Sequence, residues 1–353
     1  MPDLLYFVAL SLTPCSCWRA SADRLRRGLP PRTALELACA KPGTAPGASS
    51  RFRALAARVV EAAQSVRATP VTWSDPAYPA ALTTIPDPPF VLWIRGSAGV
   101  LSTPGVAIVG ARAASPYALN VAERLAGDLA AAGLTIVSGL ARGVDAAAHR
   151  GALKAGGRTV GVLGSGIDVI YPREHEPLAR DMEVIGCVAT ELVPGTPPQR
   201  RFFPLRNRII SGLTRAVIVV EAGEKSGSLI TARCALDQGR DVLAVPGNVL
   251  SGRNRGAHAL LRDGATIVET ADDVLTELGL SRLDGDTSGS GLNRAPDPIL
   301  ACLIPGESSD LDEIAARSGL SPSRLLPRLF ELELQGAVAR VGGGRFVRVD
   351  RSC

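Results

Sequence analysis

The strongest constraint on the fold is a series of short apolar segments that alternates with helical windows from about residue 100 onward. Each segment is rich in Val, Ile and Ala and ends at glycine or a small polar residue. This pattern is typical of parallel strands buried on both faces. The pronounced segments are 106–109, 134–137, 159–163 and 216–220, and weaker ones occupy 187–189, 241–245 and 265–268.

Helical periodicity fills the gaps between these segments. The clearest windows are 117–132, 143–155 and 228–238, and each ends beside a glycine suited to stop a helix. Repeated strand–helix alternation predicts an α/β fold, specifically an extended Rossmann-like, doubly wound and mostly parallel sheet.

The regions flanking this alternation differ in composition, and we predict separate domains for them. Residues 1–68 contain short helical stretches interrupted by Pro and Gly, which predicts a small helical domain, and 69–279 would form the α/β core. A Gly/Ser/Asp-rich stretch at 280–296 is typical of a linker. Two helical segments and a glycine-turned hairpin then predict a winged helix over 297–353. Its expected helices are 309–317 and 322–335, and its two strands flank 342–344.

Composition excludes a disordered chain and weakens the inference of a nucleic-acid partner from net charge. With 353 residues of which 46% are hydrophobic, the chain is not disordered as a whole. Its net charge of +5 is unevenly distributed. Residues 1–70 hold ten basic and four acidic residues (+6), whereas 71–275 hold 20 and 19 (+1). The net charge of the core therefore says little about a nucleic-acid partner.

Cysteine usage and hydropathy bear on the compartment. The seven cysteines include no C-x-x-C pair, so we expect neither a metal site nor a disulfide framework, and a reducing cytoplasm. The apolar run 4–12 follows Asp3 and no basic residue, which favours a buried helix over an export signal. No run reaches the ~18 apolar residues of a membrane span.

Glycine, serine and basic residues follow the predicted strands. Because the carboxyl ends of parallel strands meet at one edge, these loops should converge there and offer backbone amides and positive charge to a phosphate. Each loop alone is more simply a tight turn, but their convergence favours a phosphate site. The candidates are Gly110, Arg112, Ser138, Gly139, Arg142, Gly143, Gly164, Ser165, Gly166, Lys225, Ser226, Gly227 and Ser228. Asp145 fits a helix N-terminus better than a ribose ligand.

Motifs for nucleotide-dependent chemistry are incomplete. The segment around Lys225 lacks the Gly-x-x-x-x-Gly-Lys pattern, and 164–169 breaks G-x-G-x-x-G at its last glycine. No Ser or Cys stands beside a histidine or carboxylate in a way that indicates a nucleophile and base. We therefore predict no catalytic residues and no cofactor.

The segment 200–212 combines four arginines, two phenylalanines and an asparagine at a helix start. Arginine binds phosphates and phenylalanine stacks on unpaired bases, which together favour a single-stranded nucleic acid. The alternative is that one Phe fills the core and the arginines are solvated. We assign Phe203, Arg206, Asn207 and Arg208 to the site.

On these residues the chain resembles the DNA processing protein A (DprA/Smf) family. The resemblance spans about residues 70–275, and the linker and winged helix match the architecture of many members. The matching segments are 73–79, 88–96, 109–112, 138–145, 148–149, 162–168, 171–172, 203–210, 226–233 and 245–247. Ala111 stands where the family usually has Ser or Thr.

The resemblance implies single-stranded DNA binding without catalysis. It implies protection of incoming DNA in natural transformation, loading of the RecA recombinase, and a homodimer. It places Arg112 on a phosphate, with Lys225 and the serines after it in the same pocket and Arg206, Asn207 and Arg208 beside it. Duplex DNA is a second candidate ligand.

The sequence leaves alternatives for the function and for the dimer contact. A nucleotide phosphoribohydrolase of the cytokinin-activating (LOG) type would share the core, and Glu191 and Glu224 are the carboxylates to test; a protein-binding scaffold is a third reading. For a dimer contact, Leu260 and Leu261 are apolar in a polar neighbourhood, although a buried helix face explains them equally.

Overall fold

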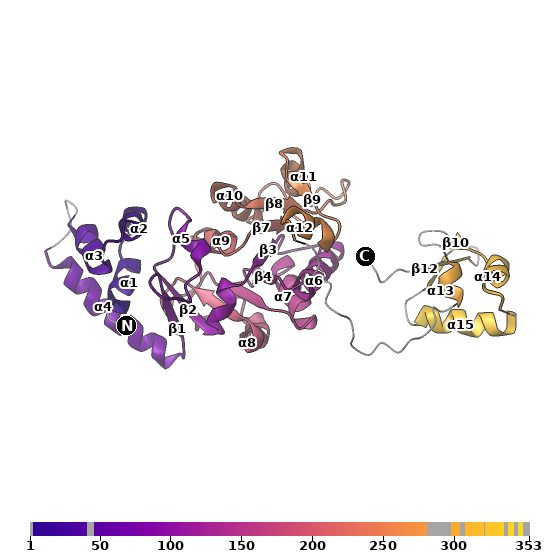
Figure 1. Cartoon of the computed structure of the whole chain (residues 1–353), viewed down its shortest axis with the longest axis horizontal. Coiled ribbons are helices and arrows are strands. Elements are labelled where there is room, and N and C mark those ends of the chain that lie inside the picture. The colour runs from indigo at the N-terminus through magenta and orange to yellow at the C-terminus, as the bar shows by residue number, and fades with distance from the viewer. Residues whose placement is uncertain are drawn as a thin grey trace. The chain divides into compact units, whose positions relative to one another are not determined.

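A computed structural model describes residues 3–40, 46–280, 298–303, 308–320, 322–334, 338–341 and 345–348. The chain forms two compact units, Met1–Leu283 and Asp284–Cys353 (Figure 1). Nearly all of the predicted linker 280–296 and the predicted glycine turn 342–344 lie outside the described residues.

In the described part of the first unit, nine strands form one sheet in the order β1-β2-β6-β5-β4-β3-β7-β8-β9. The seven strands from β6 to β9 are parallel, and β1 and β2 add antiparallel at the β6 edge. The order reverses between β3 and β7, which is the topological switch point of a doubly wound sheet. The strands are β1 (Thr69–Thr72), β2 (Val91–Gly96), β3 (Gly105–Val109), β4 (Thr135–Ser138), β5 (Thr159–Val162), β6 (Cys187–Thr190), β7 (Ala216–Val219), β8 (Asp241–Ala244) and β9 (Thr266–Ile267).

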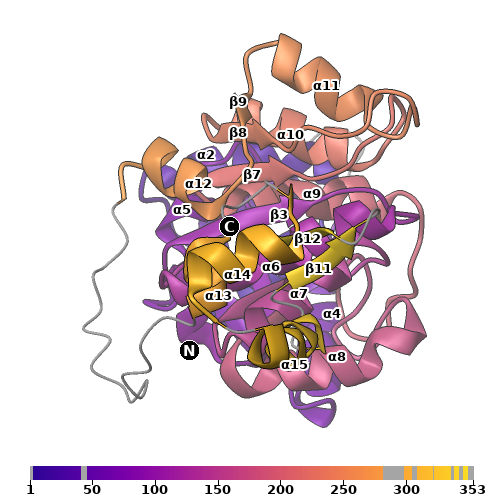
Figure 2. The ribbon, with the colours of Figure 1, turned by 90° about the vertical axis from the view of Figure 1, so that its right-hand side faces the viewer.

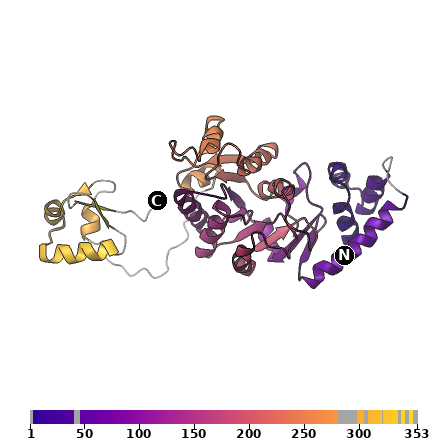
Figure 3. The same cartoon turned by 180° about the vertical axis from the view of Figure 1, so that it is seen from behind.

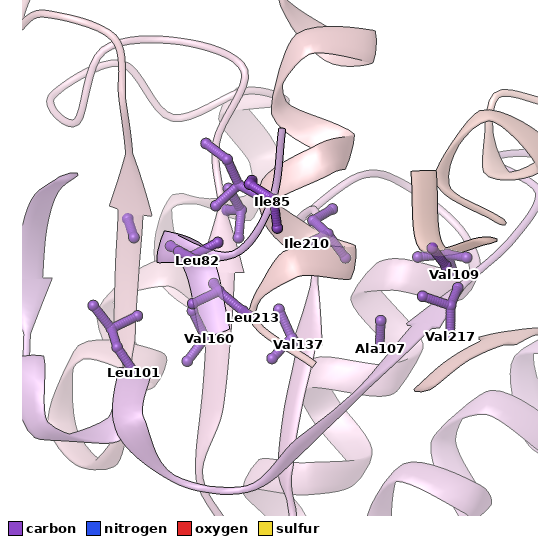
Figure 4. Packing of buried hydrophobic residues seen from close by; sticks show 14 of the residues in the cluster. Leu82, Ile85, Leu101, Ala107, Val109, Val137, Val160, Ile210, Leu213 and Val217 are labelled. Carbon is purple, nitrogen blue, oxygen red and sulfur yellow. The ribbon is translucent and has the colours of Figure 1, made fainter. Parts of the chain in front are cut away.

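Helices cover both faces of the sheet because its strands are apolar on both sides. Along β3, Val106 and Ile108 pack with α6, α7 and α12, while Ala107 and Val109 pack with α5, α9, α10 and α11. Figure 4 shows the face that α9 covers, where Ile210 of α9 and Leu213, which directly follows the helix, lie over the strands. These helices and their neighbour α8 are α5 (Ala80–Thr83), α6 (Pro116–Ala131), α7 (Val144–Lys154), α8 (Glu176–Ile185), α9 (Phe202–Gly212), α10 (Ser228–Asp237), α11 (Arg255–Arg262) and α12 (Ala271–Glu277).

The predicted α/β class is confirmed, and every apolar segment predicted as a strand forms one. The helices predicted at 117–132, 143–155 and 228–238 also form, and Gly133 follows the first with φ +90°, a conformation that glycine adopts without strain. The antiparallel pair β1–β2 was not predicted, because Pro70 interrupts a short first strand. Short 3₁₀ turns complete the unit: η1 (Cys15–Cys17), η2 (Ala98–Ser102) and η3 (Arg173–His175).

Four helices precede the sheet: α1 (Leu4–Ser11), α2 (Trp18–Arg26), α3 (Pro31–Cys39) and α4 (Ala48–Ser65). The helix predicted at 4–12 is confirmed, and its residues Phe7–Leu10 are buried in one cluster with Phe90, Val91 and Trp93 at β2. Figure 3 shows α1–α4 beside the β1–β2 end of the sheet, and Figure 2 shows α11 and β9 far from α8. The boundary at residue 68 stays a prediction.

The second unit contains α13 (Pro298–Cys302), β10 (Ser308–Ser309), α14 (Leu311–Ser318), α15 (Pro322–Leu334), β11 (Val338–Val341) and β12 (Arg345–Arg348). The three strands form a sheet in the order β10-β12-β11. The first predicted helix starts two residues later than expected, because Ser309 pairs with Phe346 and Asp310 caps α14 by accepting from the Glu313 amide at 2.9 Å. In the part of the chain that the structure describes, no helix is long and apolar enough to cross a membrane.

Candidate nucleic-acid interface

A cavity of about 790 Å³ lies at the carboxyl ends of the parallel strands, beside the switch point between β3 and β7. The loops after β3, β4, β5 and β7 and the start of α9 all reach it, as expected for an open α/β sheet. Of the predicted site residues, it is lined by Gly110, Arg112, Phe203, Arg206, Asn207, Lys225, Ser226, Gly227 and Ser228.

The charge of the cavity is strongly positive. Its lining holds the cations Arg112, Arg200, Arg206 and Lys225 and one carboxylate, Asp145. Arg112, Arg200 and Lys225 are exposed, and none of them forms an ion pair with another described residue. Cations without a protein partner remain available to an anionic ligand.

Arg206 is buried in the cavity wall, with 6% of the residue exposed. Its Nη2 donates to the Gly139 carbonyl at 3.1 Å. Burial lowers the pKa of Arg206 to about 10, so the guanidinium stays charged at neutral pH. Asp145 faces it and accepts from the Gly139 amide at 3.1 Å; burial raises the pKa of this carboxyl, while Arg206 pulls it down. Asp145 therefore organises the start of α7, as predicted, and no ribose role is needed.

Two glycines leave space for the side chains of α9. A Cβ at Gly139 would lie 1.4 Å from Arg206 Nη1, and a Cβ at Gly164 would lie 2.7 Å from the Phe203 ring. Gly143 serves a related purpose with φ +76°, since it brings the start of α7 against the Ala111 carbonyl. These glycines were predicted to cradle phosphate, and their demonstrated contacts are with the protein itself.

An aromatic platform lies within the cavity. The Phe203 ring has the Arg112 guanidinium 4.9 Å from its centroid and the Tyr171 ring 5.8 Å away. Tyr171 is 43% exposed and was not among the predicted site residues, although the Tyr-Pro sequence after β5 belongs to the family-like segments. A partly exposed aromatic beside an unpaired arginine is a surface for stacking an unpaired base.

The floor of the cavity includes the start of α10. Ser226 and Ser228 share a hydrogen bond of 2.8 Å between their hydroxyls, and Asn207 Nδ2 donates to the Gly227 carbonyl at 3.3 Å. The positive end of the α10 dipole thus faces the same space as Lys225.

Other predicted residues lie outside the lining. Ser138 donates to the Ile108 carbonyl at 2.6 Å and is buried, and Ser165 bonds the Val169 carbonyl. Gly166 packs against the backbone at Val193. Arg142 is exposed and forms a bidentate pair with Glu174 at 2.6 and 2.8 Å.

Arg208 was predicted beside the pocket, but it points elsewhere. It is 5% exposed, pairs with Glu191 and, at 3.3 Å, with Asp87, and lies 5.8 Å from the Trp18 ring. The geometry therefore favours a structural role for Arg208 that joins the N-terminal helices to the core. Leu260 and Leu261 are half-buried and pack on the core cluster, which favours the buried-face reading.

Two histidines hold a strained peptide beneath the cavity. Leu140 is fully buried with φ +55°, a region unfavourable for leucine. Its amide donates to His149 Nε2 at 3.3 Å, and its carbonyl accepts from His175 Nδ1 at 2.9 Å. His149 Nδ1 in turn contacts Thr159 Oγ1 at 2.7 Å. The clamp places Gly139 and Ala141, the neighbours of Leu140, against Arg206 and the cavity.

The fold and cavity together define a Rossmann-like protein with a cationic, aromatic-lined site at the switch point. The model of the DNA recombination-mediator protein A family matches residues 69–279, and that of the DprA winged helix domain matches 286–344. The chain belongs to this DprA/Smf family. It is 40% identical to Protein Smf of Escherichia coli K12 over 78% of this chain and 76% of that protein, and 45% identical to DNA processing protein DprA of Streptococcus pneumoniae over 58% and 72%.

Solved structures agree in fold. DNA processing protein A of S. pneumoniae matches with a TM-score of 0.68 at 34% identity, covering 77% of this chain and 96% of that one. DNA processing protein A of Helicobacter pylori, whose structure describes a single-stranded DNA binding mode, matches with a TM-score of 0.54 at 30% identity over 60% and 95%.

The histidine clamp predicts a pH-dependent stability. Burial lowers the pKa of His149 from 6.5 to about 3, so below about pH 6.5 only the unfolded chain takes up the proton. Between about pH 7 and about pH 5, the wild type should lose ~2 kcal/mol of unfolding free energy through this residue. His149→Gln should not show that loss. Urea unfolding of both proteins at the two pH values tests this, and equal pH dependence would contradict it.

The space at Gly139 predicts a selective defect. Gly139→Ala should displace the Arg206 guanidinium and remove its 3.1 Å bond to the backbone. We expect at least a tenfold loss of affinity for single-stranded oligonucleotide, about 1.4 kcal/mol, with near-normal circular dichroism. Gly99→Ala is the control for an added methyl group, because the backbone there has no positive φ and the new Cβ would meet nothing nearer than 3.9 Å. Wild-type affinity in Gly139→Ala would show that the Arg206 position does not matter.

Proposed function

We propose that this chain binds single-stranded DNA in the cavity and does not act on it chemically. Backbone phosphates contact Arg112, Lys225 and the start of α10, and an unpaired base stacks on Phe203. The observation that carries the proposal is that one cavity holds a partly exposed aromatic platform together with three exposed cations, none of which has an ion pair among the described residues. Single strands are bound by this combination of charge and stacking surface.

The contacts of the described carboxylates in and near the cavity support a binding role. Asp145, the one carboxylate in the lining, is engaged by the backbone amides of Gly139 and Ala141. Of the two carboxylates considered for a phosphoribohydrolase, Glu191 pairs with Arg208, and Glu224 lies 3.7 Å from Arg255. Neither lines the cavity, so the LOG-type alternative has little support.

Family membership supports a proposal for the biological role and the partners. We infer a cytoplasmic homodimer that protects incoming single strands and helps to load RecA on them during transformation and recombination. For the dimer, Leu260 and Leu261 remain candidate contacts, and Ile267 of the edge strand β9 is 50% exposed nearby in the sequence. Duplex DNA remains a candidate ligand for the winged helix.

Removal of single cations tests the proposal. Arg112→Ala and Lys225→Ala should each weaken single-strand binding several-fold and reduce the slope of log affinity against log salt by ~0.7, because one fewer phosphate contact releases fewer counterions. Arg124→Ala and Lys154→Ala make the same charge changes on α6 and α7, outside the cavity, and should have little effect. Fluorescence anisotropy at several salt concentrations measures both quantities.

Two results would overturn the proposal. One is unchanged affinity and salt slope in both cavity variants. The other is release of free base from a nucleoside monophosphate by the wild type, which would return the chain to the phosphoribohydrolase class.

A further inference from the structure

A second cavity, of about 610 Å³, lies on another side of α9. The N-terminal helices supply one wall through Leu12, Thr13 and Trp18, and the segment before β2 supplies another through Pro88 and Pro89. Phe202 and Leu205 of α9 complete the apolar lining. The first cavity shares none of these residues.

Helix α9 lies between the two cavities, and neighbouring residues of its first turn line different cavities. Successive helical residues point about 100° apart, so adjacent side chains serve different surfaces. In the first turn of α9, Phe203 lines the first cavity and Phe202 the second. Of the two residues that precede the helix, Arg200 lines the first cavity and Arg201 the second. The residues just before α9 therefore offer two adjacent arginines between the aromatic surfaces of the two cavities.

In the second cavity, as in the first, an arginine guanidinium lies over a phenylalanine ring. The Arg201 guanidinium lies 4.9 Å from the Phe202 centroid, as Arg112 does from Phe203. Trp18 is held in place by a 3.0 Å bond from its Nε1 to the Thr13 carbonyl, so its ring is an ordered surface. Flat, apolar and ordered walls fit a planar heterocycle better than a flexible chain.

The charges around this cavity do not repel a nucleotide. Among the described lining residues, Glu191 is the one carboxylate; its side chain is 8% exposed and paired with Arg208, and burial raises the pKa of that carboxyl. Arg201 is exposed at the rim. The charge of Glu191 inside the cavity is thus balanced by Arg208, and Arg201 is free of the interior and able to hold a backbone phosphate.

We propose that the second cavity takes an unpaired base of the same DNA strand that occupies the first. The strand crosses the start of α9, Arg200 and Arg201 bind phosphates on the way, and the base docks between Trp18 and Phe202. This inference rests on the proposed function. It gives the N-terminal helices a direct part in holding the strand.

The test measures the affinity of the full chain for a short and for a long oligonucleotide. A strand of about three thymidines should reach only the first cavity, whereas one of about 20 should reach both. Phe202→Ala should weaken the long strand about 5- to 100-fold, the equivalent of one lost stacking contact, and leave the short one unchanged. Phe202→Tyr should restore binding, and Phe52→Ala is a half-buried aromatic control outside both cavities.

Tryptophan fluorescence supplies an independent readout. The long strand should quench wild-type emission through Trp18, and Trp18→Phe should remove that quench while Trp73→Phe keeps it. Equal long-strand affinity in Phe202→Ala, or an equal quench in Trp18→Phe, would overturn the second-cavity proposal. If Arg112→Ala still weakens both strands, the proposed function stands; if Arg112→Ala also has no effect, the proposed function fails as well.

Discussion

The buried guanidinium of Arg206 is the contact on which the site depends. It ties α9, which follows β6, to the loop after β4 through the Gly139 carbonyl. A buried charge is costly without partners, and Arg206 Nε has none among the described residues. The arrangement is therefore held by its surroundings: the missing side chain at Gly139, the carboxylate of Asp145 and the histidine clamp on Leu140. Moving any of these would move the helix that carries Phe203.

The position of α9 also explains how a nearly neutral core can bind a polyanion. The core has a net charge of only +1 over residues 71–275, yet four cations line one cavity at the carboxyl edge of the sheet: Arg112, Arg200, Arg206 and Lys225. Some other arginines pair with a carboxylate, as Arg95 does with Glu183 and Arg142 with Glu174. Placement therefore matters more than total charge, and the resulting affinity should depend strongly on salt.

Much of the fold could be predicted because its signals are local. Buried parallel strands need uninterrupted apolar residues, and glycine after a helix provides a conformation that other residues adopt at a cost. Convergence of the loops followed from parallel topology alone. The β1–β2 pair was missed because short antiparallel additions at a sheet edge leave a weak pattern, and Tyr171 was missed because a lone aromatic after a strand does not reveal what it faces.

The sequence by itself determined the α/β class, the sheet edge that gathers cations, and the chemistry of segment 200–212. Only the tertiary structure decided which arginines face the cavity. Arg206 and Arg208 are two positions apart, about 200° around a helix, so they lie on nearly opposite sides. Which side meets the cavity depends on how α9 packs, through Ile209 and Ile210, against strands distant in the sequence. The same packing places side chains of α9 in the space beside Gly139 and Gly164. The sequence does not show this, because the segment that packs against a glycine is set by the tertiary fold.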